Sequence, residues 1–282
     1  MRRYIVFFII LHFVCNGVAW SQSQRALVIG LGQQEDTSWP KINGDKDIQY
    51  VKEMLTWFGY KDIRTLVNKQ ATKARIVAAF NRMATTCTYG DIVYIHYSGH
   101  GQQVRDMDGD EKDHKDEAWI PYDAWQKRGK KDKGEKHLID DEIGILLSKI
   151  KDKIGEKGKM LVVVDACHSG DSSRGDIVCR GAIKQTDSDG VFYIPGKRQA
   201  KRQKVKERWL TLSACGENQF CQEKSYPKVG LLTYALFCQS KSGNVEMKDI
   251  RLFVSQNKKE PPQDPVLTGE TTKYNLSDFL KK

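Results

Sequence analysis

The sequence lacks three features that would point to simple classes of protein. Beyond residue 20, no apolar run approaches the ~20 residues that a membrane-spanning helix needs. There is no Cys-x-x-Cys pair and no histidine at zinc-finger spacing from a cysteine, which argues against a structural zinc site. Internal repeats and long low-complexity tracts are absent too, which argues against a repeat protein. With 39% apolar and 29% charged residues, the 282-residue chain has the composition of a folded globular protein.

The N-terminus has the pattern of a secretory signal peptide. Residues 1–3 carry positive charge, residues 4–14 form an apolar run, and residues 17–19 offer small side chains for cleavage. We therefore expect residues 1–21 to be removed and the mature chain to be secreted or periplasmic; a retained amphipathic anchor is the alternative. Loss of Cys15 would leave six of the seven cysteines in a compartment where disulfides form.

From residue 25 onward, short apolar runs alternate with amphipathic segments. In residues 47–58, for example, Ile48, Val51 and Leu55 recur at helical spacing. Strands separated by about 10 to 15 helical residues imply crossover connections and a parallel sheet covered on both faces. We predict one domain over residues 22–282, a three-layer α/β/α sandwich with a mostly parallel sheet. The expected strands are 25–31, 63–67, 91–97, 160–164 and 209–212, and the expected helices are 47–58, 72–83, 140–150 and 231–239.

The surplus of positive charge is uneven along the chain. Forty-six Lys and Arg against 36 Asp and Glu give a net charge of +10, and much of the surplus lies in two inserts, residues 126–136 and 174–208. Such tracts favour anionic partners. Aromatic residues are sparse in the second insert, which argues against nucleic acid as that partner.

Two predicted strands end in segments that carry reactive side chains. The strand over 91–97 runs into YSGHG at residues 97–101, and the strand over 160–164 runs into DACHSG at residues 165–170. In parallel sheets, sites form beyond the carboxyl ends of the strands. A lone cysteine or histidine there is more often structural, but the pair together is what a thiol nucleophile and its base require.

These segments resemble the histidine and cysteine boxes of the caspase-like cysteine peptidases (clan CD, family C14). The Asp before Ala-Cys is similar to the metacaspase and orthocaspase branch. The likeness runs from residue 25 to about residue 239 and includes acidic segments at 106–117 and 139–142 and a Ser-Ala-Cys stretch within 212–219. The resemblance implies a caspase-like sheet and hydrolysis of peptide bonds through a thioester acyl-enzyme.

Carried onto this chain, the resemblance implies roles for three residues. Cys167 is the nucleophile, and His100 is its proton-transfer partner. The backbone N–H groups of Gly101 and Cys167 would hold the oxyanion. His168, next to the nucleophile, is the rival base.

The carboxylate of Asp165 implies cleavage after Arg or Lys, because it would pair with a basic side chain of the substrate. The family supplies a second pocket carboxylate before the first helix. Asp47 fits the helical phase best, and Asp45 is the alternative. Ser98, which precedes the Gly-His-Gly segment, is expected to form part of the pocket wall.

The resemblance also implies a calcium site. Residues 106–117 place acidic side chains at EF-hand spacing, but Glu111 replaces the glycine that the turn needs, so that interpretation fails. Asp116, Asp140 and Asp141 match acidic positions that bind Ca²⁺ in calcium-activated metacaspases. The alternative is a solvated acidic loop with Asp140 at a helix start.

The basic insert 174–208 suggests self-processing. An enzyme that cuts after Arg or Lys could cleave its own chain there, for example after Arg198, Lys201, Arg202 or Lys206. We expect a monomer that acts on protein or peptide substrates. The alternative is a non-catalytic caspase-like scaffold whose basic inserts bind anionic surface polymers.

Overall fold

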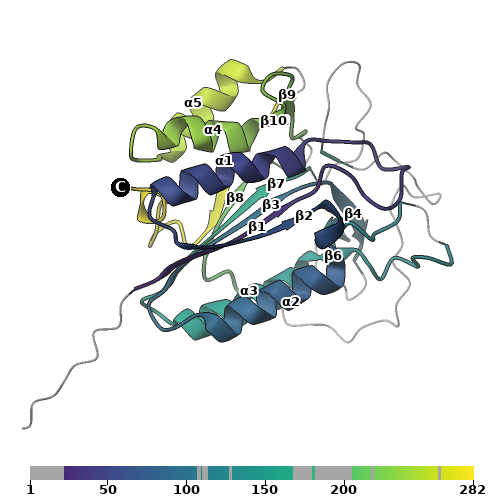
Figure 1. Cartoon of the computed structure of the whole chain (residues 1–282), viewed down its shortest axis with the longest axis horizontal. Coiled ribbons are helices and arrows are strands. Elements are labelled where there is room, and N and C mark those ends of the chain that lie inside the picture. Colours follow the sequence, from purple (N-terminus) through teal and green to yellow (C-terminus); the bar gives the residue numbers. More distant parts are fainter. Residues whose placement is uncertain are drawn as a thin grey trace, which may run out of the picture.

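The computed structural model describes residues 22–106, 109, 114–126, 129–167, 180–181, 205–216, 219–259 and 262–282. Its centre is a six-stranded sheet in the order β11-β8-β7-β3-β1-β2 (Figure 1). Five strands are parallel and β11 is antiparallel to β8. The strands are β1 (Gln24–Gly30), β2 (Asp62–Val67), β3 (Ile92–Ser98), β7 (Lys159–Asp165), β8 (Leu210–Ser213) and β11 (Val266–Gly269). The predicted signal peptide lies outside the described residues.

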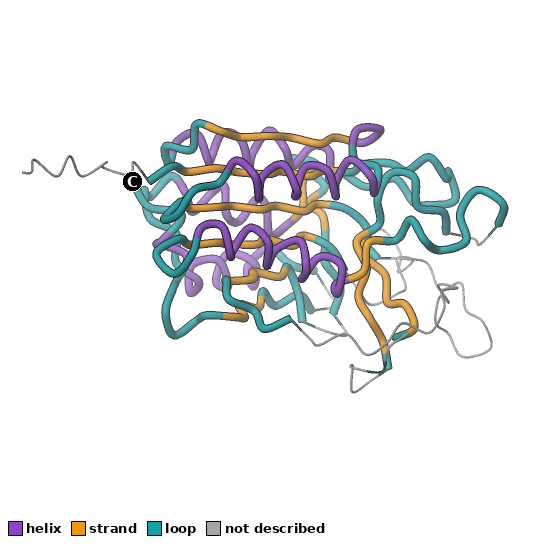
Figure 2. Tube along the Cα trace, turned by 90° about the horizontal axis from the view of Figure 1, so that it is seen from below, coloured by secondary structure: helices purple, strands orange, loops and turns teal. Residues whose placement is uncertain are grey.

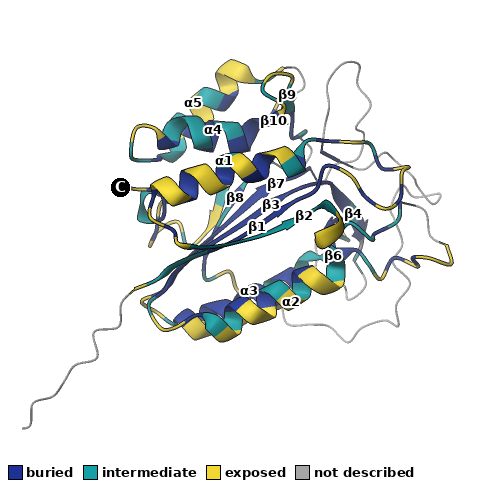
Figure 3. Ribbon diagram, in the orientation of Figure 1, coloured by how far each residue is buried: buried dark blue, intermediate teal, exposed yellow. Residues whose placement is uncertain are grey.

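Helices cover both faces of the sheet (Figures 1 and 2). Alternation along β1 sends Ala26 and Val28 into the core beneath one helical layer and Leu27 and Ile29 into the core beneath the other. The first layer is α1 (Gly44–Trp57), α4 (Leu231–Ser240) and α5 (Met247–Asn257), and the second is α2 (Lys73–Thr86) and α3 (Asp140–Ile154). Figure 3 shows buried strands between helices whose outer faces are exposed. The predicted α/β/α sandwich is confirmed.

Local sequence signals explain several element ends. Thr72 caps α2 by accepting a hydrogen bond from the Arg75 N–H. Gly59 follows α1 with a φ of +91°, a left-handed conformation that suits glycine. Helix α1 begins at Gly44, three residues before the predicted start at Asp47.

A smaller antiparallel sheet was not predicted from the sequence. It consists of β4 (Gly101–Arg105), β5 (Lys115–Trp119) and β6 (Leu138–Ile139). Because β4 begins at Gly101, the residue after His100 is anchored to a sheet edge. Polar and charged residues dominate β4 and β5, so their strand pattern is weak. The short strands β9 (Glu223–Lys224) and β10 (Val229–Gly230) form a separate pair.

The two basic inserts differ in how far the structure describes them. In the first, a buried Asp132 accepts hydrogen bonds from the backbone N–H groups of Trp125 and Gly134 at 2.7 and 2.8 Å. In the second, only Arg180, Gly181 and residues 205–208 are described. None of the helices in the described segments has the length and apolarity of a membrane span.

Candidate active site

The two reactive side chains predicted from the sequence follow neighbouring strands. Strands β3 and β7 pair in parallel, and their last residues, Ser98 and Asp165, are partners in the register. His100 and Cys167 each lie two residues beyond that pair, and both are fully buried. The sheet therefore brings the imidazole and the thiol to one edge.

Tyr97 fixes the backbone at His100. Its ring stacks on Trp119 with centroids 4.3 Å apart, and its hydroxyl donates to the His100 carbonyl oxygen at 2.7 Å. The Ile120 N–H in turn donates to the same hydroxyl at 2.9 Å. Because the Tyr97 hydroxyl is buried and both donates and accepts a hydrogen bond, this side chain is a rigid support for the residues that follow β3.

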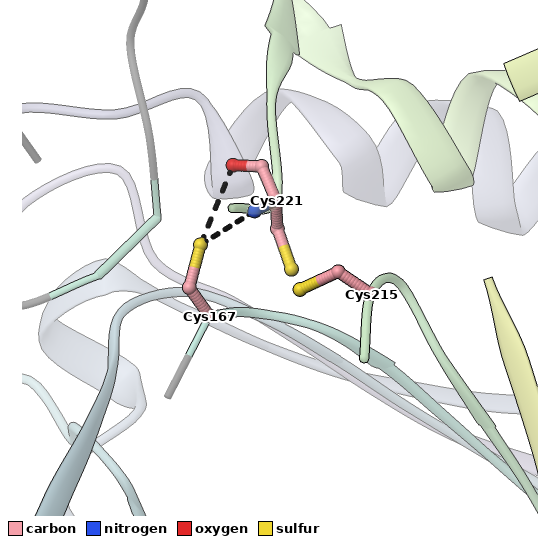
Figure 4. Close-up of side chains that lie close together, drawn as sticks. All are labelled: Cys167, Cys215 and Cys221. Carbon is pink, nitrogen blue, oxygen red and sulfur yellow. Dashed lines mark hydrogen bonds between the residues drawn. The ribbon is translucent and has the colours of Figure 1, made fainter. Parts of the chain in front are cut away.

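The Cys167 sulfur belongs to a cluster of three thiols. The Sγ atoms of Cys167, Cys215 and Cys221 all lie within 4.8 Å of one another (Figure 4). The Cys221 N–H donates to Cys167 Sγ at 2.6 Å. This cluster is the one group of three potential metal-ligating side chains at such spacing in the described segments.

The cluster favours a thiolate on Cys167 alone. Burial raises the pKa of Cys167, but hydrogen bonds from the other two thiols and from backbone N–H groups outweigh it and hold that pKa well below the usual thiol value. Hydrogen bonding to Cys167 raises the pKa of Cys215, and burial raises that of Cys221. The two neighbours therefore keep their protons, and Cys167 is the thiol of the cluster that gives up its proton most readily to a base.

His100 is held as a neutral base. Its Nε2–H donates to the Pro40 carbonyl oxygen at 2.8 Å, which leaves the lone pair on Nδ1, a buried atom without a hydrogen-bond partner. The Trp39 ring lies 5.2 Å from the imidazole, centroid to centroid. Burial lowers the pKa of His100 to about 4, against the opposing influence of the Pro40 carbonyl and the Cys167 charge.

Two backbone N–H groups converge on one carbonyl oxygen. The N–H groups of Gly101 and Cys167 each donate to the Arg180 carbonyl oxygen at 3.1 Å. These are the two donors that the sequence assigned to an oxyanion. Cys167 Sγ and His100 make no direct hydrogen bond to each other.

The Arg180 side chain is completely buried among three carboxylates, Asp47, Asp165 and Glu223, which we call the acidic cluster. Its Nη1 lies 2.7 Å from Asp47 Oδ2 and 3.3 Å from Asp165 Oδ1. Its Nε lies 3.0 Å from Glu223 Oε1. Burial acts to lower the pKa of Arg180, but the negative charge of the three carboxylates outweighs it and raises that pKa above its usual value.

The carboxylates of the acidic cluster are themselves fixed by neighbours. Thr233 donates to Asp165 Oδ2 from its hydroxyl at 2.6 Å and its N–H at 2.9 Å. The Gly230 N–H donates to Asp47 Oδ1 at 2.9 Å. A side chain at Gly230 would collide with Asp165 and with the Arg180 guanidinium, so this position must be glycine. The sequence reasoning missed Glu223 and Thr233, because their roles depend on where the C-terminal half returns to the sheet.

Two other predicted pocket residues lie elsewhere. Asp45, the alternative to Asp47, accepts from Asn68 Nδ2 at 3.2 Å and lines a cavity of about 550 Å³, which Glu223 also lines. Ser98 is buried and bonds His96 Nε2 at 2.9 Å rather than Arg180. It therefore reaches the acidic cluster only indirectly, through His96 and Thr233.

The predicted calcium ligands do not form one coordination group. Asp140 and Asp141 line a cavity of about 590 Å³ together with Glu117, but Asp116 is absent from that lining. Within the residues that the structure describes, no group of three carboxylates gathers there with its oxygen atoms within 4.8 Å of one another. A calcium ion shared by the three residues therefore stays a prediction, and no catalytic step is derived through one.

Comparison with known proteins places these features in a family. A family model described as "Metacaspase, peptidase C14 domain" matches residues 24–173, which include Asp47, His100 and Cys167. The chain belongs to the metacaspase family. The matched region ends before Arg180 and Glu223, so these two residues lie outside what the family model covers.

Among curated relatives, Metacaspase-1 of Eremothecium gossypii is 30% identical over 158 residues. Metacaspase-1 of Ajellomyces capsulatus is 33% identical over 135 residues. These matches cover 52% and 44% of this metacaspase chain but only 32% and 35% of the relatives. The chain therefore aligns with about a third of the length of the curated relatives.

Two solved structures share the fold. Protein GSU0716 from Geobacter sulfurreducens superposes with a TM-score of 0.65 at 26% identity, covering 92% of this chain and 97% of that one. Caspase-1 from Spodoptera frugiperda superposes with a TM-score of 0.58 at 12% identity, covering 93% and 91%. The second likeness shows that the metacaspase chain has a caspase-like fold.

Proposed function

We propose that this metacaspase is a cysteine endopeptidase that cleaves peptide bonds after Arg or Lys. One observation carries the specificity: the acidic cluster surrounds a buried guanidinium with Asp47, Asp165 and Glu223. A buried cation is retained only where carboxylates compensate its loss of water. Lysine can reach the same carboxylates as a point charge, whereas an acidic side chain would be repelled.

The mechanism uses the groups at the two strand ends. Nδ1 of His100 takes the proton of Cys167, and the sulfur attacks the carbonyl carbon of the substrate. The N–H groups of Gly101 and Cys167 then stabilise the oxyanion of the tetrahedral intermediate. His100 gives its proton to the departing amine, which leaves a thioester on Cys167. Water, activated by Nδ1, hydrolyses the thioester and releases the carboxylic acid.

Hydrolysis of matched peptide amides tests this function. We expect turnover of reporters ending in Arg or Lys, and none above background for the same peptide ending in Asp. A preference for Asp, or for neutral residues, would contradict the proposed specificity. If no reporter is hydrolysed by any form of the chain, the non-catalytic scaffold with polymer-binding inserts becomes the better account.

The pH profile should show a titration that belongs to Asp165. Burial raises the pKa of Asp165 to about 6, against the lowering influence of Arg180, and Asp47 raises it further. A basic substrate needs the ionised carboxylate, so kcat/KM for an arginine reporter falls as the pH decreases through about 6. His100, with a pKa of about 4, and His96, also lowered to about 4 by burial, do not titrate in that range.

The control is Asp165→Asn, which cannot ionise. Its kcat/KM, although lower, should lack the acid limb near pH 6 in a profile measured from pH 4.5 to 8. An unchanged limb in Asp165→Asn would assign the titration to another group.

Calcium dependence stays a separate hypothesis on Asp116, Asp140 and Asp141. If it holds, activity rises on titration with free Ca²⁺ and disappears with a chelator. Asp140→Asn should weaken the response at least about tenfold, because each carboxylate contributes charge to such a site. Activity that is the same in chelator and in millimolar calcium would dismiss the metal.

Self-processing within residues 174–208 and export through removal of residues 1–21 complete the proposal. Lys206 is described and exposed, while Arg198, Lys201 and Arg202 lie outside the described residues. N-terminal sequencing of the exported protein would locate the signal cleavage. The preference for basic residues makes the second insert the natural place to look for self-cleavage.

A further inference from the structure

The backbone of Arg180 and Gly181 is aligned at the catalytic groups as a bound substrate would be. The Arg180 carbonyl oxygen accepts from the N–H groups of Gly101 and Cys167, and the Arg180 N–H donates to the Cys221 carbonyl oxygen at 3.1 Å. Gly181 forms a parallel bridge with Gly101 at the start of β4. Three backbone hydrogen bonds at Arg180 and the pairing of Gly181 thus hold the backbone on both sides of this peptide bond.

A purely structural ion cluster would not need this arrangement. Burying the guanidinium against Asp47, Asp165 and Glu223 fixes the side chain of Arg180 but makes no demand on its carbonyl group. Here the carbonyl oxygen also lies between the two N–H donors nearest the nucleophile. Side chain and carbonyl are therefore both bound in the manner expected of the residue before a scissile bond.

The reacting groups flank the same peptide bond. The Cys221 N–H donates to Cys167 Sγ at 2.6 Å while the Cys221 carbonyl oxygen accepts from the Arg180 N–H, so the sulfur lies beside Arg180. Gly181 pairs with Gly101, the residue that follows His100 in the chain. The nucleophile thus lies next to the acyl residue of the bond, and the residue after the proton donor pairs with the residue on the amine side.

We propose that the Arg180–Gly181 bond is the first substrate of this metacaspase, and that Arg180 blocks the intact enzyme until that bond is cut. This inference rests on the proposed function, because it needs Cys167 as the nucleophile. Cys167 Sγ bonds to the Arg180 carbonyl carbon as the C–N bond breaks, and His100 protonates the new Gly181 amine. Water then hydrolyses the thioester and leaves a carboxylate on Arg180.

Arg180 can block the active site because it belongs to the same chain as that site. A group joined to the site by the same chain has an effective concentration in the millimolar range, at or above the 1 μM–1 mM KM values of typical enzymes. An external substrate therefore competes poorly with Arg180. After cleavage, the new Arg180 carboxylate lies beside the negative Cys167 sulfur and loses the anchor of Gly181. Charge repulsion then favours its release.

Because the Arg180–Gly181 bond already lies in the active site of its own chain, its cleavage is an intramolecular reaction. We expect wild-type chain to yield one fragment ending at Arg180 and another beginning at Gly181, read by intact mass and N-terminal sequencing. The rate should be first order and independent of protein concentration. Cys167→Ala should remain whole at this bond. Cleavage only elsewhere in residues 174–208, or a rate proportional to concentration, would overturn the inference.

Two matched variants test inhibition by Arg180 separately from cleavage after Arg180. Arg180→Gln removes the charge that the acidic cluster binds, and Gly181→Pro keeps Arg180 but makes the following bond a tertiary amide without an N–H. Both should stay uncut at this position. Arg180→Gln should nevertheless hydrolyse an arginine reporter at least about tenfold faster than Gly181→Pro, because its site is open. Equal rates would refute the block.

Arg180→Gln leaves three buried carboxylates without a counter-ion. Arg180→Lys is therefore a second variant that tests the inference if Arg180→Gln does not fold. The lysine variant keeps a cation in the acidic cluster and should still be cut after residue 180. Loss of cleavage in a folded lysine variant would count against the inference. Failure of the proposed function gives a different pattern: no variant, whether cut or whole, hydrolyses any basic reporter.

Discussion

Hydrolysis of an arginine-terminated reporter is expected to fall at least about 10³-fold when Cys167→Ala is added to Arg180→Gln, the variant whose site is open, as measured by initial rates. Alanine retains the backbone N–H that holds the oxyanion but removes the atom that forms the thioester. The residual rate would come from binding and oxyanion stabilisation alone. In that open background, Cys167→Ala should leave binding of the reporter about unchanged.

The matched control is Cys215→Ser, a change in the same thiol cluster. The hydroxyl can still donate a hydrogen bond to Cys167, so this variant should remain within about tenfold of the wild type. Because a hydroxyl differs from a thiol as a donor, we expect the thiolate titration to shift while turnover persists. Full activity in Cys167→Ala, or equal losses in the two variants, would remove Cys167 from its role.

A second large effect is expected at the acidic cluster. Asp165→Asn and Asp47→Asn each remove one charge that faces a buried cation, and losing one partner of such a pair costs about 2–5 kcal/mol. That corresponds to roughly 30-fold or more in kcat/KM for an arginine reporter. Competition between arginine, lysine and glutamine reporters would measure the change in preference directly.

Asp45→Asn is the internal control for this prediction. Asp45 lies on the same helix, two residues from Asp47, but contacts Asn68 instead of Arg180. Its amide variant should keep the wild-type preference for basic residues. If Asp45→Asn loses as much as Asp47→Asn, the effect reflects helix α1 or the protein's overall charge rather than the acidic cluster.

Local signals in the sequence were sufficient for the parallel core and for the strand ends. The apolar β7 and the aromatic, β-branched β3 have strong patterns, and the sharp change to polar residues after each one locates His100 and Cys167. Helical periodicity also favoured Asp47 over Asp45, because Asp47 shares the inward face of α1 with Ile48 and Val51. These features depend on neighbours within a few residues.

The rest of the site depends on contacts between distant parts of the chain. Arg180 meets Asp47 across 133 residues, and Thr233 meets the same carboxylate across 186. No periodicity in a basic insert distinguishes Arg180 from its neighbours. Strand β11 was missed for a similar reason: it is short, half exposed and paired only at the sheet edge.

The position of Arg180 within the fold has a consequence for the protein after cleavage. Strand β7 precedes the Arg180–Gly181 bond and β8 follows it, yet the two are hydrogen-bonded neighbours inside the sheet. Helices α4 and α5, both on the later side, share their core with α1 on the earlier side. The mature molecule would thus be a heterodimer of interleaved fragments that neither diffuse apart nor fold alone, and its refolding would become a bimolecular event.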